Sequence, residues 1–178
     1  SYIVYLTSLL AVYGTSAAFH VIDWDSKKHE VIMQTLDHAN IFFLIAGTYT
    51  PVCTSCLPWE EPWVRHILIA AWSIAAAGII KCIFWRNPPK LLNVAFYFIC
   101  GLTILPFLPR IFGVVNPLFA YAFITGGVFY LVGGTVYGIE WPDPFPDTFG
   151  YHEIFHLCTI LANLCFFIPI VYCIFNEK

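Results

Sequence analysis

The sequence predicts an all-α fold, a polytopic bundle of transmembrane helices, and two observations lead to this prediction. Of the 178 residues, 60% are hydrophobic and only 11% are charged, whereas soluble domains carry roughly 25% charged residues. The hydrophobic residues also form long runs of about 20 residues with few charges, the length of a helix that crosses a bilayer. Because these runs lack the alternating pattern of a membrane β-barrel, we expect the spans to be helices.

Six such runs predict six spans within a single transmembrane domain that covers residues 1–178. The expected spans are Tyr2–Ile22, Leu36–Leu57, Trp63–Phe84, Leu91–Pro109, Pro117–Ile139 and Tyr151–Phe175. The chain begins at Ser1 and its only methionine is Met33, so we expect the natural N-terminus to lie further upstream.

The basic residues predict the orientation of the bundle. Six spans place one group of basic residues on one side of the membrane and a smaller group on the other: Lys27, Lys28, Lys81, Arg86 and Lys90 against Arg65, Arg110 and Lys178. Since short loops rich in Lys and Arg stay in the cytoplasm, the first side is expected to be cytoplasmic. The loop Glu140–Gly150 on that side is acidic and rich in proline, which favours a stiff connector. The net charge of −3 is too small and diffuse to indicate a nucleic-acid partner.

His152 and His156 form the clearest candidate site. They lie four residues apart in the stretch His-Glu-Ile-Phe-His, so both imidazoles project from one face of a helix. This spacing lets two histidines bind one zinc ion, and a zinc site needs a third and often a fourth ligand. Because the pair begins the sixth expected span, its partners are expected at the same depth on the cytoplasmic side.

Three polar residues of earlier spans are expected at that depth. His20 ends the first span, Ser16 precedes it by one helical turn, and Asp37 begins the second span. Three histidines and a carboxylate at one depth predict a metal site. A tripod of imidazoles with an open water position favours zinc.

The remaining histidines are less suitable partners. His29 lies in a polar loop, where a solvated surface histidine is the simpler interpretation, and His66 opens the third span on the opposite side. His38 follows Asp37 directly, and adjacent helical residues point about 100° apart, so only one of the two can readily face the site.

Glu153 raises an alternative, because His-Glu-x-x-His is the zincin motif in which the glutamate is the general base. Zincins take a third ligand from further along the chain. After His156 the chain holds no histidine and a single acid, Glu177, about 30 Å away by helix rise. We therefore interpret Glu153 as a bystander on a neighbouring helix face, with a catalytic base as the alternative.

The seven cysteines lie mostly inside apolar runs, as expected for small buried side chains. Cys53 and Cys56 form a CxxC motif without a second pair, which is a weak indication of a redox or metal role.

The resemblance to a known family rests on five residues. They are Ser16, His20, Asp37, His152 and His156, in the pattern Ser-x-x-x-His, then an aspartate seventeen residues later, then His-x-x-x-His in the last span. This set resembles the hemolysin III and progestin and adipoQ receptor family over the whole chain. It is also similar to the motifs of the alkaline ceramidases, in a wider superfamily of membrane hydrolases.

The resemblance implies seven transmembrane helices, of which the first would precede this chain, with the C-terminus outside the cell. It implies that His20, His152 and His156 bind zinc near the cytoplasmic face. It also implies that Asp37 holds the water that zinc activates and that Ser16 stabilises a developing oxyanion. A glutamate at position 153 is not required by the family.

The expected function is therefore that of a zinc hydrolase of the plasma membrane or an endomembrane. Its expected substrate is a lipid amide or ester, such as a ceramide-like sphingolipid or another fatty-acyl lipid. The alternatives are a receptor or signalling protein with structural zinc, a pore-forming hemolysin, and an intramembrane protease that uses Glu153. The pore has little support, because no span carries a polar stripe that would line a wide aqueous channel.

Overall fold

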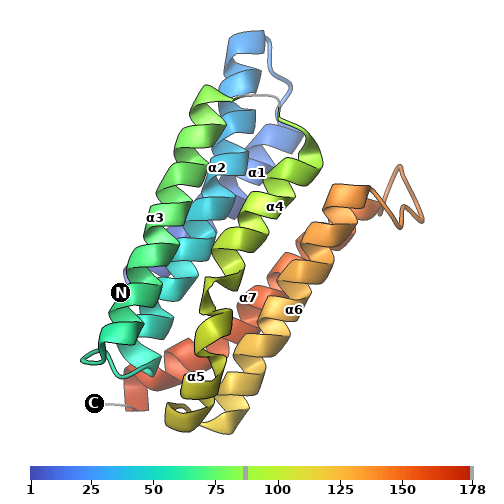
Figure 1. Cartoon of the computed structure of the whole chain (residues 1–178). Coiled ribbons are helices and arrows are strands. Elements are labelled where there is room, and N and C mark those ends of the chain that lie inside the picture. The colour runs from blue at the N-terminus through green and yellow to red at the C-terminus, as the bar shows by residue number, and fades with distance from the viewer. Residues whose placement is uncertain (86–87, 177–178) are drawn as a thin grey trace.

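The computed structural model describes residues 1–85 and 88–176, and this part of the chain is helical. In chain order the elements are α1 (Tyr2–Val21), α2 (Lys27–Pro51), the π-helical turn η1 (Val52–Cys56), α3 (Pro62–Phe84), α4 (Lys90–Gly101), the 3₁₀ segment η2 (Leu102–Phe107), α5 (Leu108–Val114), α6 (Pro117–Ile139) and α7 (Tyr151–Asn176). The all-α prediction is thus confirmed for the described residues (Figure 1). The described residues do not include Arg86 and Lys178, on which the predicted orientation partly rests, or Glu177, the acid considered as a zincin ligand.

Five of the described segments are long and apolar enough to cross a membrane, namely α1, α3, α6, α7 and the composite segment Lys90–Val114. The composite segment joins α4, η2 and α5, and it ends five residues beyond the predicted Leu91–Pro109. Pro106 lacks a backbone N–H, so the helix tightens to 3₁₀ geometry around it and then continues.

The second predicted span, Leu36–Leu57, falls within α2 and η1, and α2 begins well before it at Lys27. Helix α2 is not among the five apolar segments, because polar residues stand near its middle. One of them, Asn40, donates a hydrogen bond of 3.0 Å from Nδ2 to Oγ1 of Thr15 in α1. Asn40 is therefore satisfied by a partner inside the bundle.

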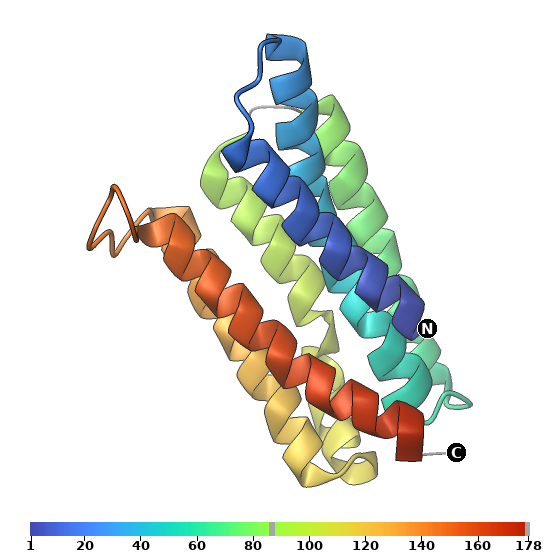
Figure 2. The same cartoon turned by 180° about the vertical axis from the view of Figure 1, so that it is seen from behind.

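The helices form a bundle in which α2 packs between α1 and α3, and α6 packs against α7. Figure 1 shows α3, α2, α4 and α6 in succession across the bundle. Seen from behind in Figure 2, α1 and α7 run in opposite directions. The last turn of α1 and the first turn of α7 therefore lie at the same end of the bundle.

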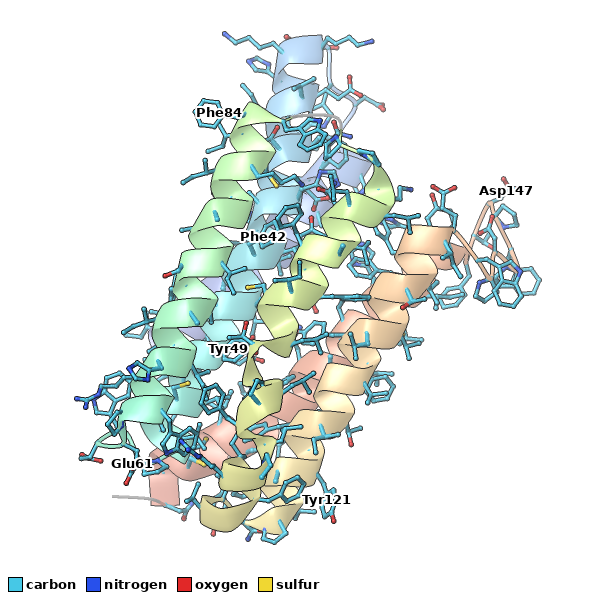
Figure 3. The ribbon with its side chains drawn as sticks, viewed as in Figure 1. Phe42, Tyr49, Glu61, Phe84, Tyr121 and Asp147 are labelled. Carbon is cyan, nitrogen blue, oxygen red and sulfur yellow. The ribbon has the colours of Figure 1, made fainter. Side chains whose placement is uncertain are left out.

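Side-chain positions follow this arrangement. Phe42 is fully buried with its ring 4.7 Å from that of Tyr97, and Tyr49 is also buried. Glu61 and Asp147, by contrast, are exposed in loops at opposite ends of the bundle (Figure 3). Apolar rings between helices and charged groups at the ends are the distribution that a membrane bundle requires.

Two glycines allow the close packing that positions the candidate site. A Cβ on Gly47 of α2 would lie 2.5 Å from Oγ of Ser8 in α1. A Cβ on Gly133 of α6 would lie 2.7 Å from Cβ of Cys158 in α7. The absence of a side chain therefore lets α1 approach α2, and α6 approach α7, at small distances.

Candidate metal and catalytic site

Three imidazoles meet where the end of α1 faces the start of α7. The ring centroids of His20 and His152 are 4.7 Å apart, and those of His152 and His156 are also 4.7 Å apart. The Nε2 atoms of His152 and His156 lie 3.0 Å from each other. The structure thus brings together the three histidines that the sequence singled out from opposite ends of the chain.

The histidine set fits zinc in donor type and number. Zinc binds imidazole nitrogen at about 2.0–2.1 Å in tetrahedral geometry, so two nitrogens on one ion lie about 3.3 Å apart. The 3.0 Å between the Nε2 atoms of His152 and His156 is close to that distance. Within residues 1–85 and 88–176, however, no group of three or more His, Cys, Asp and Glu side chains is arranged so that it could hold a metal ion. The spacing of the Nε2 atoms of His152 and His156 is thus close to that of two zinc ligands, and the His20 ring lies beside them without completing a set of three.

Ser16 and Asp37 complete the cluster on the cavity side. Ser16 is buried, and it lines the same end of the cavity as Asp37. Asp37 is half-buried and within electrostatic range of His20 and His156. A carboxylate beside three imidazoles can orient a water molecule and accept its proton, and a serine hydroxyl can donate to a developing oxyanion.

Glu153 does not join this cluster. Its side chain is exposed, and Oε2 accepts a hydrogen bond of 2.8 Å from the backbone N–H of Gly150. A glutamate at the third helical position that reaches back to the N-cap amide is the second half of a capping box. Oδ1 of Asp143 also accepts a 3.0 Å bond from the N–H of Tyr151. These two carboxylates hold the first turn of α7, and with it His152, in place.

The other histidines lie as the sequence predicts or outside the cluster. His29 is exposed at the start of α2, and His66 is exposed near the start of α3 at the opposite end. His38 is half-buried, and its carbonyl accepts a 3.3 Å hydrogen bond from the hydroxyl of Tyr97. Cys53 and Cys56 are buried in η1, far along α2 from Asp37.

Two residues at the site were not predicted from the sequence. The ring of Tyr137 in α6 lies 5.8 Å from that of His152. The ammonium group of Lys90 lies 4.9 Å from the Tyr137 ring and forms an ion pair of 2.6 Å with Glu140. Neither residue belongs to a motif, and only the fold reveals that α4 and α6 meet at the start of α7.

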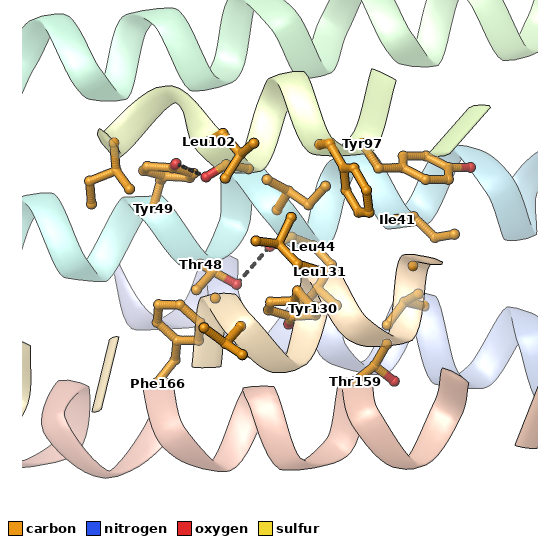
Figure 4. Close-up of a pocket in the computed structure, with 18 of the residues that line it drawn as sticks. Ile41, Leu44, Thr48, Tyr49, Tyr97, Leu102, Tyr130, Leu131, Thr159 and Phe166 are labelled. Atoms are coloured by element: carbon orange, nitrogen blue, oxygen red, sulfur yellow. Dashed lines mark hydrogen bonds between the residues drawn. The ribbon is translucent and has the colours of Figure 1, made fainter. Parts of the chain in front are cut away.

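A cavity of about 260 Å³ begins at the cluster and continues into the bundle. Ser16, Asp37, His152 and His156 line its polar end, while His20 does not line it and is exposed. The rest of the wall is almost entirely apolar. It comes mainly from α2 and α4–η2 on one side and from α6 and α7 on the other, with smaller contributions from α1 and α5 (Figure 4).

The cavity is long. Along α2 its lining residues extend from Asp37 to Val52, about 22 Å at the rise of an α-helix. Leu105 of η2 and Val128 of α6 both line the cavity, yet they are 48% and 51% exposed. The cavity is therefore lined in part by exposed side chains.

Comparison with known proteins agrees with the sequence motifs. The family model described as "Haemolysin-III related" matches residues 1–167. The chain is 31% identical to the hemolysin-3 homolog of Bacillus subtilis (strain 168) over 176 residues, and the aligned region covers 98% of this chain and 78% of that protein. It is 28% identical over 172 residues to hemolysin-3 of Bacillus cereus, covering 97% of this chain and 74% of that protein.

A similarity also extends to a human protein, the monocyte to macrophage differentiation factor. The two are 27% identical over 165 residues, which cover 89% of this chain and 64% of the human protein. The family match over nearly the whole chain confirms the resemblance found in the motifs. This multi-pass integral membrane protein therefore belongs to the haemolysin-III related family.

Proposed function

We propose that this protein is a zinc-dependent hydrolase that cleaves an amide or ester bond in a membrane lipid. The observation that carries the proposal is the junction of two features, a His–Asp–Ser cluster and an apolar cavity that begins at it. The cluster contains the groups needed for hydrolysis, and the cavity accepts little else than hydrocarbon. A ceramide-like sphingolipid or another fatty-acyl lipid has the matching shape, with a polar linkage next to a long chain.

Topology supports a lipid substrate. We take α2, which packs between the apolar helices α1 and α3, as a sixth span, since Asn40 near its middle bonds to Thr15 inside the bundle. Lys27 and Lys28 are exposed at the same end as the histidines, and basic ends of spans stay in the cytoplasm. The cluster then lies just inside the cytoplasmic leaflet of the plasma membrane or an endomembrane, at the depth of the linkage between headgroup and acyl chain.

His20, His152 and His156 would hold the zinc ion. When bound, zinc lowers the pKa of water to about 7 and polarises a carbonyl oxygen. Asp37 accepts the proton of the attacking water and returns it to the leaving nitrogen or oxygen, so that a carboxylic acid and an amine or alcohol form. The hydroxyl of Ser16 would donate a hydrogen bond to the carbonyl oxygen as negative charge develops on it.

The cavity provides binding and exclusion of water. An acyl chain in the space between Asp37 and Val52 would be removed from bulk lipid and held with its carbonyl at the cluster. About 22 Å of helix corresponds to a chain of roughly 16–18 carbons, taking about 1.3 Å per methylene. Leu105 and Val128, which line the cavity and are exposed, would give a lipid from the bilayer its entry to the cavity.

The proposal is tested with the purified protein, its metal content and a panel of ceramides and fatty-acyl esters. We expect zinc to copurify and at least one lipid class to be hydrolysed, with turnover lost in Asp37→Asn. Zinc without turnover over the whole panel would contradict the enzymatic part and favour a receptor with structural zinc. Dye release from vesicles that depends on His152 would instead favour a pore.

A further inference from the structure

Asn163 is a buried polar residue in the middle of the apolar helix α7, 7% exposed, and its hydrogen-bonding capacity is fully used. Its Oδ1 accepts bonds from the hydroxyls of Tyr5 at 3.1 Å and Tyr130 at 2.9 Å. Its Nδ2 donates to the hydroxyl of Tyr13 and to the carbonyl of Thr159, both at 2.9 Å. One side chain thus connects α1, α6 and α7 within the hydrocarbon layer.

The network extends to the candidate metal site. The hydroxyl of Tyr13 lies 3.4 Å from Oγ1 of Thr159, to which it donates. Oγ1 of Thr159 in turn donates a 2.8 Å bond to the carbonyl of His156. On α1, Tyr13 is followed three and seven residues later by Ser16 and His20, which lie on the same helix face.

These hydrogen bonds bridge helices whose main packing partners are different. Helix α1 packs its backbone closely against α2, while α7 packs against α6 and η1. His20 belongs to the first pair of helices, and His152 and His156 belong to the second. The separation of α1 from α7 decides whether the third imidazole can reach the other two, and Asn163 and Tyr13 join these helices about two turns from the histidines.

We propose that Asn163 and Tyr13 are positioning residues for the metal site, a role that rests on the proposed function. Within the hydrocarbon layer these polar groups must be hydrogen-bonded by other protein groups, because bulk water does not replace a lost partner. The arrangement in which every member of the network is satisfied is therefore strongly favoured over others. That arrangement fixes the register and spacing of α1 against α7. Without either residue, the distance between α1 and α7 varies more widely, and His20 is less often close enough to His152 and His156 to share an ion with them.

Zinc affinity and interhelical distance test this inference together. Tyr13→Phe removes one hydroxyl of the network, and Tyr49→Phe is the matched control. Tyr49 is also buried and also lines the cavity, but its hydroxyl bonds to the carbonyl of Gly101 and joins α2 to α4. Zinc affinity is measured by competition with a chelator, and the thermal unfolding temperature of the zinc-free protein is measured alongside.

We expect Tyr13→Phe and Asn163→Leu to lower zinc affinity by roughly tenfold, at the lower end of the loss that removal of a ligand's hydrogen-bond partner causes. The control Tyr49→Phe is expected to keep its zinc affinity even if its unfolding temperature falls as much as that of Tyr13→Phe. Equal affinity losses in Tyr13→Phe and Tyr49→Phe would show a general structural effect and overturn the inference. Asn163→Gln, which keeps an amide, is expected to lower zinc affinity by less than tenfold. If the Asn163 variants do not fold, the comparison of Tyr13→Phe with Tyr49→Phe alone tests the inference.

A measurement without metal separates this inference from the proposed function. Spin labels on cysteines that replace Val21 of α1 and Leu157 of α7, both exposed, report the α1–α7 distance in the zinc-free protein. We expect a narrow distance distribution that broadens in Tyr13→Phe and not in Tyr49→Phe. An unchanged distribution in Tyr13→Phe overturns the positioning role. Absence of zinc from the unmodified protein, with the broadening present, overturns the proposed function alone.

Discussion

At the scale of single residues, the proposed chemistry depends on Asp37. It lines the polar end of the cavity together with Ser16 and lies within electrostatic range of three histidines, His38, His20 and His156. We predict that Asp37→Asn lowers kcat by roughly 100- to 10,000-fold, the range for loss of a general base, while zinc content is unchanged. Steady-state kinetics and elemental analysis of the same preparation check this. Loss of zinc together with activity would make Asp37 a ligand instead.

Glu153 provides the complementary prediction. Its carboxylate caps α7 by accepting the N–H of Gly150, a bond that a glutamine oxygen can also accept. We predict that Glu153→Gln keeps turnover within about threefold of the unmodified protein, whereas removal of a general base costs at least ~100-fold. A rate assay on both variants compares the two carboxylates. If Glu153→Gln were inactive while Asp37→Asn kept its activity, the result would favour the alternative of a zincin-like protease with Glu153 as its general base.

The cluster residues could be predicted from the sequence because each has a recognisable spacing or stands at the end of an apolar run. Ser16 and His20 are one helical turn apart, as are His152 and His156. Tyr137 could not be predicted, since its proximity to His152 depends on how α6 packs against α7. The same holds for Asn163, whose role depends on tyrosines from two other helices.

At the scale of elements, glycines set the distances between helices. Gly47 faces Ser8 at the α1–α2 contact, whereas nothing lies within 4 Å of a Cβ placed on Gly14 of α1. We predict that Gly47→Ala lowers the free energy of unfolding by about 1–3 kcal/mol, as overpacking does. Gly14→Ala is predicted to be neutral or slightly stabilising, because alanine is the better helix former. Thermal unfolding in one detergent compares them, and equal stabilities would contradict the close α1–α2 contact.

Helix positions followed from the sequence where hydrophobicity alone decides them. The third and fifth expected spans agree with α3 and α6 to within one residue, because charged or proline residues flank both. The start of α2 at Lys27 and the continuation of the fourth span to Val114 were not predicted. Both depend on backbone hydrogen bonds that persist through polar or proline-containing sequence, which a search for uncharged runs does not detect.

At the scale of the whole molecule, the length of the cavity predicts selectivity for acyl chain length. Ala120 of α6 is buried and lines the end furthest from the histidines. We predict that Ala120→Leu shifts kcat/KM toward shorter chains by roughly tenfold, since two displaced methylenes at ~0.8 kcal/mol each correspond to that factor. Ala122→Leu is the control, because Ala122 is not among the lining residues. An unchanged chain-length profile in Ala120→Leu would show that acyl chains do not occupy this cavity.

The central claim is that three histidines from the two ends of the chain hold one zinc ion, and elemental analysis of the purified protein tests it most directly. The measurement compares the unmodified protein with His20→Ala, since His20 alone comes from α1. The account predicts a single zinc ion per chain in the unmodified protein and a large loss of zinc in His20→Ala. Absence of zinc from the unmodified protein, or full zinc content in His20→Ala, would contradict it.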